Sequence, residues 1–473
     1  MMPSSKTITA DNLIALGADR LAAILYSLSQ EDAHIKQRLR LALAEQAGIE
    51  TVANEVKKRL ASLKRSQAAI ACEKIHALKQ DLYLQYETIV ERIAPKRPDL
   101  ALELLWLFMG LAPSIYERSY DRNNDLSMVF HQPREDLGGI AQRANPEPMA
   151  LANQTFTAIK ANDYGQYEGL VEILFPALGQ QGVAHLKAKI NAALAIHPKR
   201  QDNRFDYQER VLVRALQDLA DQEKDVDAYI ALTTAAEQRM PHVAAQIAHR
   251  LLNAGRGEEA MTALLEGHPQ LHANRYHASS HEWDKVYLET LDATNRTEEA
   301  QTIRLEKFDQ HLNSEALRAY LKRLPAFDQA AVEEKALAYA LQFPNAVVAL
   351  NFFSSWPSLS YAAQLTLTRT SEIDGDACYS LDETAQQLAG SYPLAATLLR
   401  RAMIEAILRS AKSKRYRHAV RHLAECQSLD NLISCYEPYV SHQTFVATLR
   451  TAHSRKSGFW AHMKEFGMDQ PIA

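Results

Sequence analysis

The densest group of histidines lies in the stretch HANRYHASSHEWD, which begins at His272. His277 and His281 are four residues apart, so on a helix they share one face and could bind a transition metal. Asp284 follows, but the spacing fixes no third ligand. A polar loop entering a helix anchored by Trp283 explains the same residues. We therefore predict no metal site and no cofactor, and we keep a metal-dependent enzyme as an alternative.

Asp121, Asn123 and Asp125 have the spacing of the first three ligands in a calcium-binding EF-hand loop. Such a loop also needs a glycine at its sixth position and a glutamate at its twelfth. Leu126 and Gln132 stand there instead. The sequence therefore predicts a capped loop between helices, without calcium.

Two tyrosines mark the block NDYGQYEG. Tyr164 and Tyr167, with Asp163 and Glu168, could form a rim that contacts a ligand. Alternatively, Asn162 or Asp163 caps a helix that begins near Tyr164, and the tyrosines pack against a neighbouring helix. We take the two tyrosines as candidate binding residues and leave both interpretations open.

Basic side chains are densest in the stretch RSAKSKRYRHAVRH near the C-terminal end. Arginines with an interleaved aromatic residue suit phosphate contact and base stacking. The same residues suit an acidic protein partner, or simply a solvated helix face. The candidate binding residues here are Lys412, Lys414, Arg415, Tyr416, Arg417, Arg421 and Arg455.

The net charge of −4 hides an uneven distribution. Residues 1–97 carry 15 basic and 11 acidic side chains, and residues 397–473 carry 12 and 6. The middle, 98–396, carries 26 basic and 40 acidic side chains. Both ends are therefore basic and the body is acidic, which excludes a uniformly cationic nucleic-acid binder.

Catalytic signatures are missing from the sequence. It has no GxxxxGK[ST], GxGxxG, GxSxG or HExxH motif. Its cysteines are few and widely spaced, with no CxxC pair: Cys72, Cys378, Cys426 and Cys435. We predict no catalytic residues, lean toward a protein that is not an enzyme, and expect a reducing, cytoplasmic location.

Export and membrane signals are also missing. The start, MMPSSKTITADNL, has one lysine and no apolar run, unlike a signal peptide. The most apolar stretch runs from Leu100 to Ala112 and contains Glu103. It falls short of the roughly 20 residues that span a bilayer, so we expect a buried helix and no membrane partner.

Helical periodicity runs through almost every long segment. Val52, Val56, Leu60 and Leu63, for example, repeat at intervals of three or four residues, which places them on one helix face. Only 16 of 473 residues are glycine, and no long segment alternates strictly between apolar and polar residues. The sequence predicts an all-α protein.

Proline and glycine divide the chain into many short helices. Pro146 and Pro148 open a predicted helix that runs to about Lys160, and Gly179 and Gly182 separate the next two. The segment 197–206, HPKRQDNRFD, has no apolar periodicity. We therefore place a boundary there, between an N-terminal helical domain (1–200) and a second domain (201–473).

The second domain contains similar helix pairs. Glu258-Glu259-Ala260 and Glu298-Glu299-Ala300 follow short turns forty residues apart, and 392–423 has the same form. The pattern resembles tetratricopeptide repeats, although the spacing differs and the family's tryptophan and leucine-glycine positions are absent. We predict an irregular α-solenoid with tetratricopeptide-like helix pairs, and an irregular helical bundle is the alternative.

Three blocks carry a second, separate resemblance that covers most of the chain: KKRLASLKRS (57–66), ANDYGQYEGLVEILFPALG (161–179) and HSRKSGFW (453–460). Together they resemble an uncharacterised bacterial family that carries a domain of unknown function. The resemblance implies helical repeats and no reaction, and it supplies no catalytic residues.

These observations favour a non-catalytic helical-repeat scaffold that binds a protein partner, because stacked helix pairs create an extended surface. A nucleic-acid-associated factor, acting in regulation or phage defence through the basic C-terminal helix, is an alternative. The metal-dependent enzyme is a further one.

Overall fold

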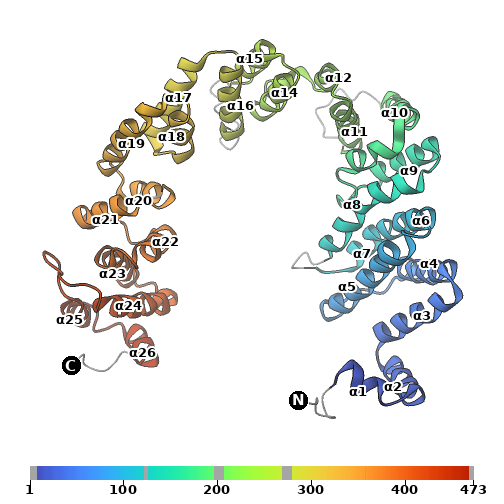
Figure 1. Ribbon diagram of the computed structural model, residues 1–473, viewed down its shortest axis with the longest axis horizontal. Coiled ribbons are helices and arrows are strands. Elements are labelled where there is room, and N and C mark those ends of the chain that lie inside the picture. The colour runs from blue at the N-terminus through green and yellow to red at the C-terminus, as the bar shows by residue number, and fades with distance from the viewer. Residues whose placement is uncertain (1–7, 122–125, 197–206, 269–279, 357, 468–473) are drawn as a thin grey trace. The chain divides into compact units, whose positions relative to one another are not determined.

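Helices make up the regular structure of the protein (Figure 1). The computed structural model describes residues 8–121, 126–196, 207–268, 280–356 and 358–467. Within these ranges β pairing is limited to one isolated bridge, between Ile70 and Ser119. The all-α prediction is therefore confirmed.

The chain forms two compact units, 1–283 and 284–473, divided inside helix α16. The helices of the first unit are α1 (Ala10–Ile14), α2 (Ala18–Glu31), α3 (Ala33–Ala47), α4 (Ile49–Arg65), α5 (Cys72–Glu87), the π-helix η1 (Thr88–Ile93), α6 (Pro98–Met109), α7 (Ala112–Arg118), α8 (Ser127–Ala144), α9 (Pro148–Lys160), α10 (Leu170–Ile196), α11 (Tyr207–Glu223), α12 (Val226–Ala231), α13 (Ala235–Gln238), α14 (Pro241–Asn253) and α15 (Gly257–Glu266). Those that follow are α16 (Ser280–Ala293), α17 (Thr297–His311), α18 (Ser314–Leu321), α19 (Ala326–Leu341), α20 (Ala346–Ser355), α21 (Leu359–Thr368), η3 (Thr370–Glu372), α22 (Cys378–Leu388), α23 (Pro393–Arg409), η4 (Ser413–Arg415), α24 (Tyr416–Asp430), α25 (His442–Ala452) and α26 (Ser457–Glu465).

Most helices pack on helices one or two places away in the sequence, such as α14 on α15, α22 on α23 and α23 on α24. Each unit has its own apolar core. In the first unit one core extends from Leu41 to Leu219. In the second, one core lies between Phe308 and Leu429, and a further cluster joins α23 to α26.

Local sequence signals account for several of these elements. The predicted stripe Val52, Val56, Leu60 and Leu63 is the buried face of α4. The helix predicted from Pro148 to Lys160 is α9. The predicted break at Gly179 is a kink in α10, where the backbone has φ 57°.

One turn geometry recurs between successive helices. Lys224, Gly255, Asn295 and Ala411 each have a left-handed backbone, with φ of 59°, 74°, 59° and 51°. In each case the next amide donates to the carbonyl five residues earlier, as Arg256 does to Leu251 at 2.8 Å. This is the hydrogen bond of a Schellman cap, which closes one helix and reverses the chain.

The sequence predicted that the helix starts at Glu258-Glu259-Ala260 and Glu298-Glu299-Ala300 are equivalent, and the same Schellman turn precedes both. After it, α15 and α17 each begin with an arginine cap and two glutamates in the first turn. The alanine that follows, Ala260 or Ala300, is fully buried. An alanine at this position lets the preceding helix approach closely.

The most apolar segment is packed inside the first unit. Among the described residues, Pro98–Arg118 (α6 and α7) is the one segment long and apolar enough to cross a membrane by length and composition. In its most apolar window 56 % of the residues are buried within the protein. Leu105, Phe108 and Met109 of α6 are completely buried, as expected of a core helix.

The domain boundary predicted at 197–206 lies outside the described residues. The helices on either side, α10 and α11, pack against each other within the first unit.

Candidate functional site

Helix α23 of the second unit packs on both α22 and α24 (Figure 1). A group of titratable side chains joins these three helices. The central helix, α23, begins at Pro393, whose fixed φ suits the first helical position. It is buried on most sides, and its buried residues include Arg400 and Arg401. A buried arginine needs partners, because removing a charge from water costs several kcal/mol.

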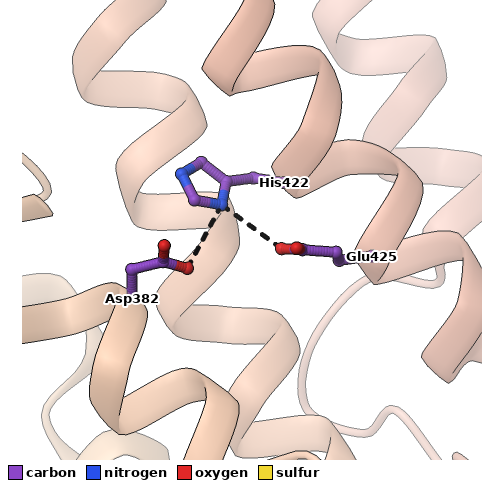
Figure 2. A group of neighbouring side chains, drawn as sticks. All are labelled: Asp382, His422 and Glu425. Atoms are coloured by element: carbon purple, nitrogen blue, oxygen red, sulfur yellow. Dashed lines mark hydrogen bonds and ion pairs between the residues drawn. The ribbon is translucent and has the colours of Figure 1, made fainter. Parts of the chain in front are cut away.

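Asp382 of α22 and His422 and Glu425 of α24 point toward one another (Figure 2). His422 and Glu425 lie three residues apart on α24 and therefore share a face. Nδ1 of His422 is 3.4 Å from Oε2 of Glu425 and 3.7 Å from Oδ1 of Asp382. The imidazole is 3 % exposed, whereas each carboxylate is 36 % exposed.

Two arginines complete the group. Nη1 of Arg400 lies 3.1 Å from Oδ1 of Asp382 and also pairs with Oε2 of Glu425. Nη2 of Arg421 lies 2.8 Å from Oδ2 of Asp382. Two guanidinium groups thus balance two carboxylates. Burial lowers the pKa of His422 despite the nearby carboxylates, so its imidazole is neutral at pH 7.

An imidazole and two carboxylates are donors that suit Zn²⁺, Mn²⁺ or Fe²⁺. Here, however, Nη1 of Arg400 contacts one oxygen of Asp382 and one of Glu425. A cation of the protein itself therefore occupies the position between the carboxylates. The arrangement acts as an ion-pair clamp across three helices, and we assign it no metal chemistry.

The sequence pointed to only one member of this clamp, Arg421. The spacing of His422 and Glu425 on one helix was a weak signal of a shared face. Nothing in the sequence linked them to Asp382, because that residue lies in a separate helix.

The predicted basic residues do not form one cluster. Lys412 pairs with Asp376 at 2.8 Å, and Arg421 pairs with Asp382. Arg415 lies against the sulfur of Cys378, with Nη1 4.0 Å from Sγ. The side chains that form no ion pair within the described residues are exposed: Lys414, Arg417 and Arg455.

Tyr416 is a core residue. It is 7 % exposed, and its ring packs edge-on against Phe459 with 6.2 Å between centroids. Its ring is not available for stacking on a nucleic-acid base.

The two predicted tyrosines of the NDYGQYEG block differ in exposure. Tyr164 is 46 % exposed and lies 5.3 Å from the ring of Tyr116. Tyr167 is 8 % exposed and packs against Trp106, and burial raises the pKa of its phenol to about 12. Tyr167 therefore packs inside the protein, as the second interpretation expects. Of these two tyrosines, only Tyr164 has an exposed ring.

The helix that we predicted to start near Tyr164 begins at Leu170 instead. The side-chain oxygen of Asn162 accepts a hydrogen bond from the backbone of Tyr167 at 2.7 Å. It therefore holds a turn before the helix, where we had expected a helix cap.

This turn borders an open groove of about 540 Å³ between α8 and α10. The groove is lined by Arg134, Glu135, Gly138, Gly139, Gln142, Glu168, Gly169, Glu172 and Ile173. Its charged residues are three glutamates and one arginine, Arg134, which is already paired with Glu135 at 2.9 Å. A surface of this kind can attract cations.

The two remaining metal hypotheses fall largely on residues that are not described. His272 and His277 lie outside the described residues, while Asp284 pairs with Lys307 at 2.6 Å. Asn123 and Asp125 also lie outside them. Oδ2 of Asp121 accepts a hydrogen bond from the backbone of Leu126 at 2.7 Å, as in the predicted capped loop.

The fold and the clamp define an all-α protein of many short helices, held by apolar packing and by ion pairs between neighbouring helices. The chain belongs to the family of unknown function DUF6880, whose model matches residues 3–462. No curated protein and no solved structure matches the chain. The predicted family resemblance is therefore confirmed, and the family brings no activity with it.

Proposed function

We propose that this protein is a non-catalytic helical-repeat scaffold that binds another protein through its first two helices. The observation that carries this proposal is that α1 and α2 bury no apolar side chain. We call the exposed apolar residues of α1, α2 and the turn between them the N-terminal apolar face: Leu13, Ile14, Leu16, Ile24, Leu25, Tyr26 and Leu28.

Exposure of these residues is unfavourable in the free chain. Ile14 is 71 % exposed and Tyr26 is 70 % exposed. Each buried Å² of apolar surface is worth roughly 25 cal/mol, so covering this face favours association. A large exposed apolar patch typically marks an interaction site.

The charge of α1 and α2 favours protein over other partners. Residues 10–31 carry three acidic side chains, Asp11, Asp19 and Glu31, and one basic side chain, Arg20. Within α1 and α2 there is thus no basic cluster that could hold the phosphates of nucleic acids or an anionic lipid surface. A protein segment with apolar side chains is the complementary partner.

The recurring turn supports the helical-repeat part of the proposal. Equivalent caps at Gly255 and Asn295 place equivalent alanines in the core forty residues apart.

The four cysteines are free thiols, which supports a reducing cytoplasmic location.

The proposal is tested with a photo-crosslinking amino acid at position 26 in living cells. We expect an adduct with one defined protein, absent when the probe replaces Tyr379, which is 92 % exposed in the second unit. The purified partner should then bind the full chain, and Leu25→Glu should weaken binding at least about tenfold. No specific adduct, or an adduct only between two copies of the chain, contradicts the proposal.

A nucleic-acid-associated role remains the second candidate because Lys414, Arg417 and Arg455 are exposed and form no ion pair within the described residues. With Tyr416 buried, such binding would rest on phosphate contacts alone. We expect it to weaken steeply as salt rises, and Lys414→Gln with Arg417→Gln to reduce that slope. Binding of single-stranded DNA that does not depend on salt contradicts this candidate.

A further inference from the structure

Arg401 is a buried arginine whose charge has no partner of opposite sign in contact with it. It is 5 % exposed, and its Nη1 donates to the carbonyl of Val440 at 2.8 Å. Its Nε and Nη2 have no hydrogen-bond partner within the described residues. Asp430 and Glu405 act on it only through space. Its neighbour Arg400, in contrast, contacts two carboxylates directly.

Two aromatic rings cover the guanidinium without satisfying its donors. Its central carbon lies 4.6 Å from the ring of Phe445 and 5.2 Å from that of Tyr436. Aromatic rings attract the face of a guanidinium, whereas its N–H groups point outward in its plane. The unpaired donors therefore still need an acceptor in that plane.

The two unpaired atoms of Arg401, Nε and Nη2, form the edge of the guanidinium with which other arginines of this chain bind carboxylates. Arg250 uses Nε and Nη2 to hold both oxygens of Asp221, each at 2.6 Å. Arg256 holds Glu259 with the same two atoms, at 2.7 and 2.6 Å. In Arg401 this two-pronged edge is buried and has no such acceptor.

Two more buried polar atoms nearby are without partners. Thr397 lies one turn before Arg401 on α23, and its Oγ1 forms no hydrogen bond within the described residues. The same is true of Nδ1 of His442, which is 1 % exposed on α25. Burial lowers the pKa of His442; the charge of Asp430 opposes this shift and the charge of Arg401 adds to it, so the net effect favours the neutral ring. Leaving such groups unpaired is costly, because each has lost its hydrogen bonds to water without gaining a replacement.

The segment 431–441, between α24 and α25, covers this region. The hydroxyl of Tyr436 donates to Asp430 at 2.6 Å, and that of Tyr439 donates to the carbonyl of Leu367. Other residues of the segment face solvent, such as Leu432, which is 62 % exposed. The contacts of Arg401 with the ring of Tyr436 and the carbonyl of Val440 place this segment directly over the buried guanidinium.

We propose that Arg401, together with Thr397 and His442, binds one small oxyanion group, a carboxylate or a phosphate, beneath the segment 431–441. The two-pronged edge of the guanidinium holds two oxygens, and the hydroxyl and the imidazole supply further hydrogen bonds. This inference does not depend on the proposed protein-binding role, because it concerns a different unit of the chain.

The test uses the purified full-length protein titrated with sodium phosphate or sodium acetate, at ionic strength held constant with sodium chloride. We expect at least one oxyanion to raise the thermal unfolding temperature with a saturating dependence. Phosphate alone identifies a phosphate group as the ligand, and acetate alone a carboxylate. No effect of either salt over chloride overturns the proposal.

Variants locate the site. Arg401→Met should weaken the anion affinity at least about tenfold, because it removes two charge-assisted hydrogen bonds. Thr397→Val is nearly isosteric, keeps the charge, and should weaken it severalfold; it remains informative if Arg401→Met does not fold. Arg318 is the matched control, since it also stacks on an aromatic ring, at 4.8 Å from Trp356, and donates to a carbonyl, that of Ser355, at 2.8 Å. An anion response that Arg401→Met and Thr397→Val both retain in full overturns the proposal.

Discussion

At the scale of single residues, two adjacent arginines of α23 show how burial changes the role of a charge. Arg400 and Arg401 are each 5 % exposed. Arg400 contacts the carboxylates of Asp382 and Glu425, so its charge is compensated within the fold. Arg401 has aromatic neighbours and one carbonyl instead. The first is therefore a structural residue, and the second is a candidate for ligand binding.

Replacing Arg400 tests the clamp. Arg400→Met removes the buried guanidinium that contacts both Asp382 and Glu425 and leaves Arg421 as their remaining cation. We expect it to lower the free energy of unfolding by about 2–3 kcal/mol. Arg409→Met is the matched control on the same helix. The side chain of Arg409 is 79 % exposed, and its ion pair with Glu405 is long, with 3.8 Å between Nη2 and Oε2. It should change stability by less than about 0.5 kcal/mol. Urea unfolding measures both variants, and equal effects would contradict the clamp.

The buried histidines predict a loss of stability in acid. Burial lowers the pKa of both His422 and His442 in the folded protein below the ordinary value of 6.5. Below about pH 6.5 the unfolded chain then binds protons that the folded chain does not, so unfolding becomes easier. The stability that the folded chain has with both histidines neutral is therefore intact above pH 6.5. It is lost as the pH falls below 6.5 toward the lower pKa that these histidines have in the folded protein.

We therefore expect the unfolding temperature to drop between pH 7.5 and 5.5, and to drop less in His422→Gln with His442→Gln. Replacing His281, which is exposed, serves as the control. Scanning fluorimetry over this pH range measures the effect. A double variant with the same pH slope as the parent chain would exclude these histidines as its cause.

At the scale of helices, two adjacent glycines of α8, Gly138 and Gly139, differ in how closely another helix approaches them. A Cβ at Gly138 of α8 would lie 2.5 Å from the backbone oxygen of Ile173 in α10. At Gly139 it would meet nothing within 4 Å. The first glycine lets two helices touch, and the second only weakens α8.

Alanine substitutions at the two positions should therefore have opposite signs. Gly138→Ala forces α8 and α10 apart and should cost about 1–3 kcal/mol. Gly139→Ala should stabilise the protein by up to about 1 kcal/mol through helix propensity. Urea unfolding followed by circular dichroism compares them, and a stabilising Gly138→Ala would contradict the close contact.

The helices also show how far the sequence predicts the fold. The apolar stripe of α4 is amphipathic by itself, so Val52 and Leu60 reveal their buried face without knowledge of any neighbour. In α23, Arg400 is charged and would be placed at the surface by the same rule. Its burial depends on carboxylates from α22 and α24, which local periodicity does not encode. The candidate site was missed for this reason, although Arg421 at its edge was identified.

At the scale of the whole molecule, the chain consists of two compact units with separate cores. Gly138 lies in the first and Arg400 in the second. Contacts within each unit are dense, and most of them join helices close in sequence. Such an organisation favours unfolding in parts, since each unit can lose its own core while the other persists.

We predict that the full chain unfolds in urea in two transitions, and that each destabilising variant moves only one of them. Gly138→Ala should lower the midpoint of the transition of the first unit, and Arg400→Met that of the second. Fluorescence separates the two, because Trp106 is in the first unit and Trp356 and Trp460 are in the second. Single-tryptophan versions of the chain make the assignment direct.

The double variant is the decisive measurement. If the units unfold separately, the effects of Gly138→Ala and Arg400→Met add, since they perturb different cores. The transition reported by Trp106 should then be the same in the double variant as in Gly138→Ala alone. A single transition that both substitutions shift together would mean that the 473 residues fold as one cooperative structure, and the division at α16 would then carry no energetic meaning.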